Sequence, residues 1–152
     1  TALRFLPVLL VASLLPAPYR MTLPPGPAHL LLFLAALALA ALLSTALVLL
    51  ICVLTVRTLS VTGPAYVVFT LQTFFSGAVI AVPFMPRALQ RLAYALPFRF
   101  LGDFPFRLYT GNIPLGEAVP TLALGIVWIA ALTVLSRLLL RCFLRRVVIQ
   151  GG

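Results

Sequence analysis

Side chains that could carry catalysis are few in this sequence and lie far apart. Its two acids, Asp103 and Glu117, are 14 positions apart, and His29 is its one histidine. The cysteines Cys52 and Cys142 lack the CxxC spacing of a metal or redox site. A zinc site, a histidine-based nucleophile dyad and a phosphate-binding glycine loop all lack their residue types. We therefore expect no enzyme, with no catalytic, metal-binding or cofactor-binding residue. His29 is interpreted as an interface residue, and the cysteines as small apolar fillers.

Four polar or small residues interrupt an apolar stretch in the middle of the chain: Gln72, Thr73, Ser76 and Gly77. Polar side chains inside a bilayer are costly and tend to face a bundle interior or a water-filled path. The simpler interpretation is packing, with hydrogen bonds between helices worth about 0.6 kcal/mol each. The functional interpretation is the lining of a path, and we treat these four as candidate path-lining residues.

A second group of candidates begins where Pro83 and Pro86 break this stretch. On a helical wheel, the polar side chains of residues 87–96 fall within one third of the circumference, and apolar side chains cover the remainder. Such a helix lies in the membrane interface with its apolar face in the acyl region. One interpretation is a simple membrane-anchoring hairpin, and the other is a gate on the outer face.

The next residues combine aromatic and charged side chains. Five aromatic residues between positions 98 and 109 alternate with Arg99, Asp103 and Arg107, which is typical of a belt at the membrane–water boundary. Asp103 is expected to cap a short helix over 103–110 and can partner either arginine, because each lies four residues away. Glu117 falls in the first turn of the following helix, where the helix dipole favours a carboxylate. The candidate outer gate comprises Pro83, Arg87, Arg91, Arg99, Asp103, Arg107 and Glu117.

Long apolar stretches determine the fold class. Residues 21–56, 58–86 and 118–136 contain no Asp, Glu, Lys or Arg, although about 20 apolar residues suffice to cross a bilayer. The sequence therefore predicts one all-α transmembrane domain over 1–152, a polytopic helix bundle with an interfacial segment before the last span. The expected spans are 2–15 (partial), 28–56, 65–82 and 118–138, and the interfacial helices are 87–96 and 103–110.

Composition supports a membrane protein and argues against other classes. Hydrophobic residues make up 63% of the chain and charged residues 9%, whereas soluble domains carry about 25% charged residues. The net charge of +9 is spread over helix ends and connections. We therefore expect no nucleic-acid partner, since nucleic-acid binding needs basic residues gathered on one face of the protein. The arginines that follow residue 136 favour a cytoplasmic C-terminus.

An ordered series of short motifs resembles a known family. Ser76 and Gly77 precede Pro83, Leu-Pro-Phe-Arg-Phe occupies 96–100, and Phe-Pro at 104–105 is followed by a tryptophan-bearing span. The chain ends on Leu-Arg-Arg-Val-Val-Ile-Gln-Gly-Gly at 144–152. This order resembles the C-terminal half of bacterial permease subunits of type-2 ATP-binding cassette (ABC) exporters.

The resemblance implies a multi-pass permease of the bacterial cytoplasmic membrane without an ATPase of its own. A separate ABC ATPase subunit would bind ATP and Mg²⁺ and dock on the cytoplasmic side, and a second permease copy or a paralogue would complete the path. Members usually have six spans, so the first two spans and the coupling helix after them are expected to be absent here. Mechanistically, ATP binding to the partner would drive alternating access.

Two other classes of function remain open at this stage. One is a membrane-embedded enzyme acting on lipid headgroups, in which Asp103 and the flanking arginines grip phosphate. It lacks a second acid, a metal cluster and a nucleophile for the chemistry. The other is a non-transporting membrane anchor or assembly protein. The sequence does not indicate a cargo, because no ring of like charges appears in the apolar stretches.

Overall fold

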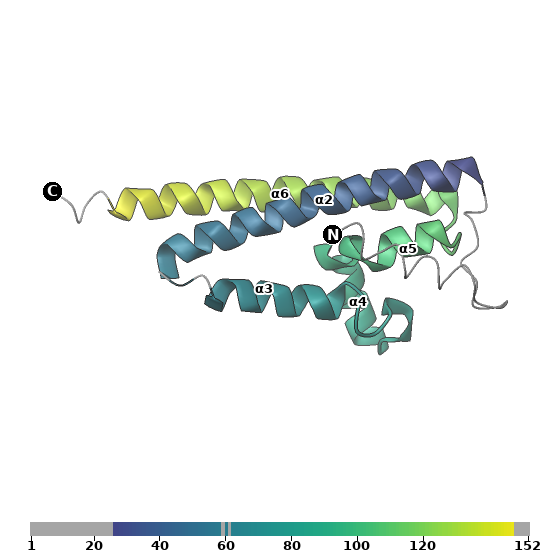
Figure 1. Cartoon of the computed structure of the whole chain (residues 1–152), viewed down its shortest axis with the longest axis horizontal. Coiled ribbons are helices and arrows are strands. Elements are labelled where there is room, and N and C mark those ends of the chain that lie inside the picture. The colour runs from purple at the N-terminus through teal and green to yellow at the C-terminus, as the bar shows by residue number, and fades with distance from the viewer. Residues whose placement is uncertain (1–25, 59, 61, 148–152) are drawn as a thin grey trace, which may run out of the picture.

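The computed structural model describes residues 26–58, 60 and 62–147, and these form helices and no strand. Two long helices lie side by side, and a shorter helix and four short helical segments pack on one side of them (Figure 1). The described residues therefore have the all-α fold that the sequence predicts. The predicted partial span at 2–15 lies outside the described residues.

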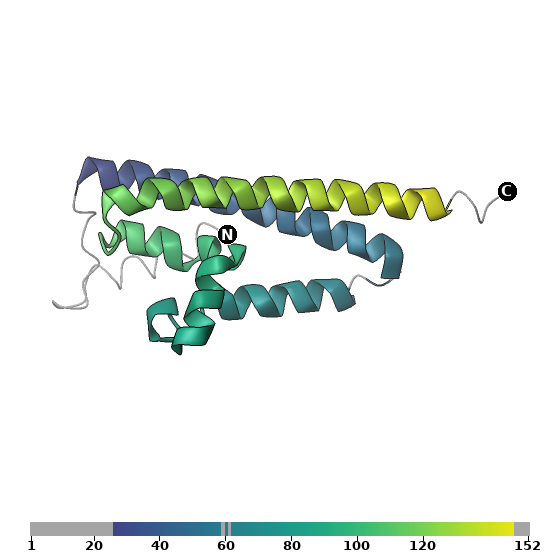
Figure 2. The same ribbon diagram turned by 180° about the vertical axis from the view of Figure 1, so that it is seen from behind.

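The two long helices are α2, Pro27–Thr58, and α6, Leu115–Val147. They start at the same end of the molecule and run in the same direction, which Figures 1 and 2 show from opposite sides. Leucine and alanine, both strong helix formers, fill much of each. The predicted spans 28–56 and 118–138 lie within these helices, and α6 extends beyond its prediction at both ends.

A glycine allows α2 and α6 to approach closely. A Cβ atom added to Gly125 of α6 would lie 2.7 Å from Cδ2 of Leu39, which is buried in α2. Close approach at small residues strengthens dispersion contacts between membrane helices. The glycine side of α6 therefore sets the distance between the two long helices.

Both long helices contain a stretch long and apolar enough to cross a membrane, Pro27–Val56 in α2 and Leu115–Phe143 in α6. Only 28% and 17% of their most apolar windows are buried within the protein. The core helix of a soluble protein would hide such a window, so these surfaces need lipid or another apolar partner. Each stretch is about 44 Å long, which exceeds the ~30 Å hydrocarbon core, so tilt or protruding ends are expected.

The third predicted span is shorter than expected. Helix α3, Thr62–Phe75, begins before residue 65 and stops well before residue 82, and its 14 residues rise only about 21 Å. The prediction of a helix over 65–82 is therefore wrong in its second part. The chain turns at Ser76 and Gly77, and Gly77 has a φ of 84°, a left-handed conformation that favours glycine.

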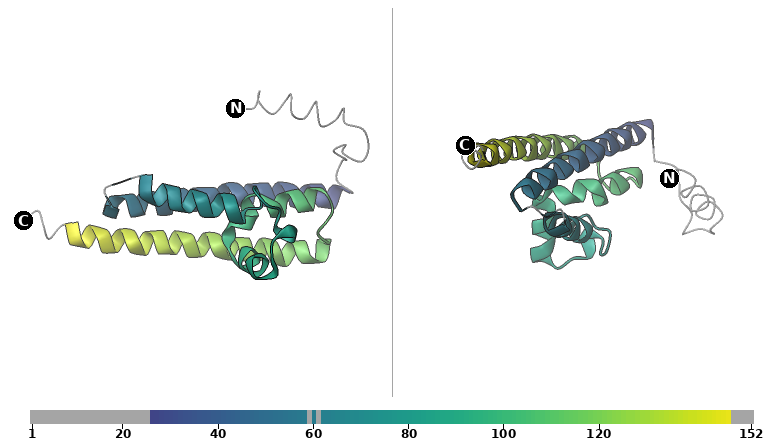
Figure 3. Two further views of the ribbon diagram at one scale, coloured as in Figure 1. Left: turned by 90° about the horizontal axis from the view of Figure 1, so that it is seen from below. Right: turned by 60° about the vertical axis from the view of Figure 1, so that its left-hand side comes forward.

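Four short segments connect α3 to α6: η2 (Val82–Phe84), α4 (Arg87–Ala95), η3 (Pro97–Leu101) and α5 (Asp103–Tyr109). Helices α4 and α5 agree to within one residue with the bounds 87–96 and 103–110 that the sequence predicts, and their place in the membrane interface stays a prediction. Together the segments form a cluster, here called the short-helix cluster (residues 82–109). It packs beside the end of α3 and against the N-terminal half of α2 (Figure 3). At this contact the rings of Phe33 and Tyr109 meet edge to face, with centroids 5.2 Å apart.

Aromatic residues of this cluster form a core, not a belt. Phe98, Phe100 and Phe104 are buried, and the rings of Phe100 and Phe104 meet edge to face at 5.5 Å. Phe106, by contrast, is exposed. The predicted belt is therefore wrong for most of these side chains, because the short helices fold back and bury them against α2.

Candidate functional site

A small polar cavity lies where the short-helix cluster meets the start of α6. Its volume is about 160 Å³, and its lining combines charged and hydroxyl-bearing side chains from four helical segments. The lining residues are Tyr94, Arg99, Asp103, Phe104, Arg107, Ile113, Glu117 and Thr121. Four predicted gate residues, Arg99, Asp103, Arg107 and Glu117, therefore come together here.

Asp103 begins α5 and ties it to the end of α3. Its backbone N–H donates to the carbonyl oxygen of Ser76 at 2.9 Å, and a Cβ on Gly102 would lie 2.7 Å from that same oxygen. The Asp103 carboxylate is nearly buried and lies 3.8 Å from a guanidinium nitrogen of Arg107. Burial raises the pKa of Asp103, and the positive charges of Arg107 and Arg99 oppose that shift.

Asp103 does not cap the helix as predicted. The N-cap residue of α5 is Gly102, and no side-chain capping bond forms. Asp103 is the first helical residue, so its side chain lies one turn before Arg107 and on the same face. Of its two predicted partners, Arg107 is within ion-pair distance. Arg99 forms no ion pair among the described residues, because it belongs to η3, before the break at Gly102.

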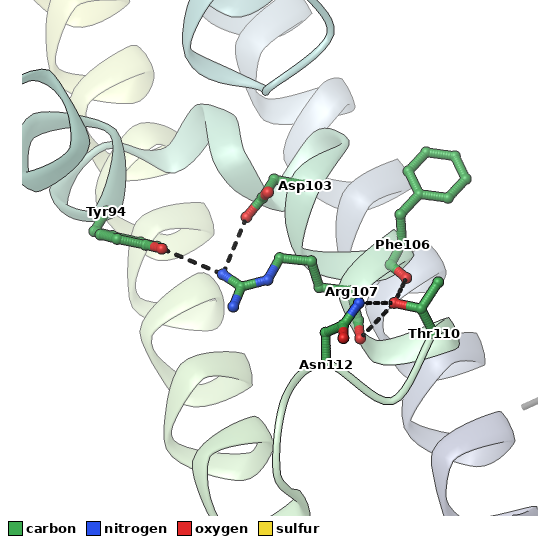
Figure 4. A network of polar contacts seen from close by, with 6 residues as sticks. All are labelled: Tyr94, Asp103, Phe106, Arg107, Thr110 and Asn112. Atoms are coloured by element: carbon green, nitrogen blue, oxygen red, sulfur yellow. Dashed lines mark hydrogen bonds and ion pairs between the residues drawn. The ribbon is translucent and has the colours of Figure 1, made fainter. Parts of the chain in front are cut away.

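Arg107 links α5 to α4. Its Nη1 donates a hydrogen bond to the Tyr94 hydroxyl at 3.2 Å, and the same nitrogen faces Asp103 (Figure 4). Its backbone oxygen accepts from the N–H of Asn112 at 2.9 Å and from the Thr110 hydroxyl at 3.3 Å. These bonds fix the end of α5, so the guanidinium is held at a set position in the cavity wall.

Arg99 is surrounded by aromatic rings. Its Cζ lies 5.0 Å from the ring centroid of Tyr94, 5.1 Å from that of Phe100 and 6.0 Å from that of Phe104. These distances suit cation–π attraction. Its Nε is buried without a hydrogen-bond partner, and burial lowers the pKa of the guanidinium. The attraction of the Asp103 carboxylate opposes this lowering of the Arg99 pKa, but desolvation is the larger effect, so an anionic ligand is favoured at this place.

The other predicted gate residues lie elsewhere. Pro83 is exposed in the first turn of η2, and Arg87 and Arg91 are exposed on α4. None of the three lines the polar cavity. The predicted gate is thus divided into a group of charged residues that line the polar cavity beside α6 and an exposed basic face on α4.

The candidate path-lining residues are also separated. Gln72 borders a cavity of about 390 Å³ between α2 and α3, and Thr73 borders another of about 310 Å³. Ser76 and Gly77 line a third, of about 410 Å³, together with Asp103 and Arg107. The Thr73 hydroxyl donates to the Phe69 carbonyl of its own helix at 2.8 Å. Within the described part of the chain the four residues thus border three separate cavities, and their lining of a path stays a prediction.

Comparison with known proteins places these features in a family. The family model described as ABC-2 type transporter matches residues 3–103, more than half of the chain. The chain belongs to the ABC-2 type transporter family. No curated protein and no solved structure was found to match it.

As an ABC-2 family member, the chain is a membrane transporter component and not a member of an enzyme family. Domains of this family work with ATPase subunits in ABC transporters. The two exposed apolar helices fit a membrane location. The matched residues end at 103, so most of α5 and all of α6 lie beyond them. No group of three metal-binding side chains occurs among the described residues of this ABC-2 protein.

Sequence reasoning missed four residues that line the polar cavity of this ABC-2 chain: the apolar Phe104 and Ile113, and the hydroxyl-bearing Tyr94 and Thr121. Tyr94 contacts both arginines of the cavity, through its hydroxyl and through its ring. Its place on the polar third of α4 was the available signal. Nothing in the local sequence marks Thr121, which reaches the cavity only because the cluster folds back onto the second turn of α6.

Proposed function

We propose that this chain is the transmembrane permease subunit of a bacterial ABC exporter. A separate subunit binds ATP and Mg²⁺ and hydrolyses the nucleotide, and this chain binds no cofactor. A second permease copy or a paralogue supplies the other wall of the substrate path. The complex resides in the cytoplasmic membrane.

One observation carries this proposal: a chain of the ABC-2 family leaves the apolar faces of both its long helices uncovered. Leu31 and Leu42 of α2, and Ile126 and Val127 of α6, are all more than half exposed. In water such surfaces would aggregate, and in a bilayer they are solvated by acyl chains or by a second permease. The described residues supply two long helices and one shorter helix to line a path, so in this proposal a partner supplies the remaining wall.

The direction of the helices supports an orientation. The short-helix cluster and the starts of α2 and α6 lie toward one end of the molecule, and the C-terminal end of α6 lies at the other (Figure 2). Arg137 and Arg141 are exposed near that C-terminal end. By the positive-inside rule this end is cytoplasmic, so the cluster lies at the outer side of the membrane.

The outer position makes the cluster a gate in this proposal. Asp103 joins the end of α3 through the Ser76 carbonyl and joins α5 to α4 through Arg107 and Tyr94. A shift of α3, caused by closure of the ATPase on the cytoplasmic side, is therefore transmitted to the cluster. Because the Asp103 carboxylate is nearly buried, a rearrangement that separates it from Arg107 requires another cation nearby, and Arg99 borders the same cavity.

The proposal is tested by purifying the tagged chain in mild detergent from its own membranes. An ATPase with a phosphate-binding Walker motif should co-purify, and the reconstituted complex should show ATP-dependent transport. Asp103→Asn should lower substrate-stimulated ATP hydrolysis, whereas Thr45→Val, at an exposed position of α2 far from the cluster in the sequence, should not. A chain that is monodisperse without detergent, or that hydrolyses ATP by itself, would contradict the proposal.

A further inference from the structure

The charges around the polar cavity are only half paired. Arg107 and Asp103 face each other at 3.8 Å, and Arg107 also bonds Tyr94. The two remaining charged groups, Arg99 and Glu117, form no ion pair among the described residues. One unpaired cation and one unpaired carboxylate therefore border the same space of about 160 Å³.

The lining indicates a ligand with both signs of charge. The two guanidinium and two carboxylate groups of the lining give a net charge of zero. A purely anionic ligand would therefore be repelled by the carboxylate of Glu117. A phosphate group beside Arg99 can bind its guanidinium, and the guanidinium of Arg107 lies in the same cavity. A cation a few atoms away from that phosphate satisfies Glu117, which is exposed in the first turn of α6.

The ligand cation should carry N–H groups. A carboxylate binds an ammonium through charge-assisted hydrogen bonds, which a quaternary ammonium cannot donate. Quaternary ammonium is held by aromatic cages instead. Here the rings of Tyr94 and Phe104 already face the Arg99 guanidinium at 5.0 Å and 6.0 Å, so they do not form an empty cage.

The depth of the cavity matches lipid headgroups. Glu117 and Thr121 lie in the first two turns of α6, whose apolar stretch of about 44 Å exceeds a hydrocarbon core of about 30 Å. The first turns therefore lie near headgroup level. The exposed arginines of α4, Arg87 and Arg91, belong to the same cluster and favour the same level.

We propose that this cavity binds the headgroup of a zwitterionic phospholipid with a primary ammonium, as in phosphatidylethanolamine. The phosphate lies against Arg99 and Arg107, and the ammonium lies against Glu117. The lipid then acts as a bridge between the short-helix cluster and α6. This site does not depend on the cargo or the direction of transport, only on the membrane position of the chain.

The test uses the full permease chain in nanodiscs of phosphatidylcholine, alone or mixed with phosphatidylethanolamine or with phosphatidylglycerol. Thermal unfolding is measured for each. Phosphatidylethanolamine should raise the midpoint by about 2–4 °C over phosphatidylcholine, as expected for saturating binding of modest affinity. Phosphatidylglycerol, which lacks the ammonium, should raise it less. Soluble glycerophosphoethanolamine, added to phosphatidylcholine nanodiscs, should not reproduce the effect if the lipid is the source.

Three variants assign the effect to the cavity. Arg99→Gln should abolish the rise in unfolding midpoint that phosphatidylethanolamine causes. Glu117→Gln should make phosphatidylethanolamine and phosphatidylglycerol raise the midpoint equally. Arg137→Gln, an exposed arginine near the other end of α6, should keep the full gain. The proposal is overturned if Arg99→Gln and Arg137→Gln behave alike. It is also overturned if Arg99→Gln lowers the midpoint equally in every lipid, because that would mean a direct role in folding.

Discussion

At the scale of single residues, the chain concentrates its buried polar chemistry at one junction. The backbone N–H of Asp103 bonds Ser76, its carboxylate faces Arg107, and Gly102 leaves room for both elements. The sequence indicated the Asp103–Arg107 pair, because four-residue spacing places side chains on one helical face. It could not exclude Arg99, since the break at Gly102 separates η3 from α5 and depends on contacts with distant residues.

Gly102 tolerates no side chain in this packing. In Gly102→Ala the new Cβ would lie 2.7 Å from the Ser76 carbonyl oxygen, a backbone atom that cannot rotate away. The backbone must therefore move away from Ser76, which should weaken the hydrogen bond from the Asp103 N–H to the Ser76 carbonyl. We expect the free energy of unfolding to fall by about 1–3 kcal/mol. Gly63→Ala is the matched control, because its Cβ meets nothing within 4 Å in the first turn of α3. Equal stability of both variants in denaturant titrations would show that this contact is not tight.

Asp103 should also give the protein a pH-dependent stability. Burial raises its pKa above the ordinary 3.8, so the folded state holds the proton more tightly than the unfolded state does. The resulting stabilisation is present below about pH 4 and is lost as the pH rises through the raised pKa. Asp103→Asn removes this pH-dependent stabilisation, because the amide does not titrate. The difference in unfolding midpoint between wild type and variant should therefore shrink or reverse as the pH rises, whereas parallel curves would rule this component out.

At the scale of elements, helices with strong local signals were predictable and helix ends set by distant contacts were not. Pro86 immediately precedes α4, and Pro97 is the first residue of η3, so a proline marks the start of each. The end of α3 is different. Its apolar sequence continues to residue 82, but the turn at Gly77 is fixed by packing against Asp103, where a Cβ would lie only 3.3 Å away. The buried aromatic core of the cluster escaped prediction for the same reason.

The contact of α2 with α6 offers a test at this scale. Gly125→Leu should push α6 away from Leu39, because even a Cβ would lie 2.7 Å from that side chain. We expect a loss of about 1–3 kcal/mol in unfolding free energy and weaker assembly with the partner subunits. Gly116→Leu on the same helix meets nothing within 4 Å and should gain slightly from better helix propensity. If Gly125→Leu is as stable as Gly116→Leu, the two helices do not depend on close approach.

At the scale of the whole molecule, the long helices expose apolar faces to lipid or partners, and one polar cavity lies between the short-helix cluster and the start of α6. Composition alone predicted the membrane class, since 63% hydrophobic residues exceed what a small soluble domain can bury. The number of spans did not follow from composition. Within the described residues two helices are long and apolar enough to cross, and α3 covers only part of the thickness.

We expect α2 and α6 to cross the bilayer and to hold the short-helix cluster and the C-terminal end of α6 on opposite sides of it. Two matched variants, Arg87→Cys on α4 and Arg141→Cys on α6, test it directly in a background with Cys52 and Cys142 replaced by serine. A membrane-impermeant maleimide should label the cysteine at position 87 in intact cells and the cysteine at position 141 only after permeabilisation. Labelling of both from the same side would contradict the account.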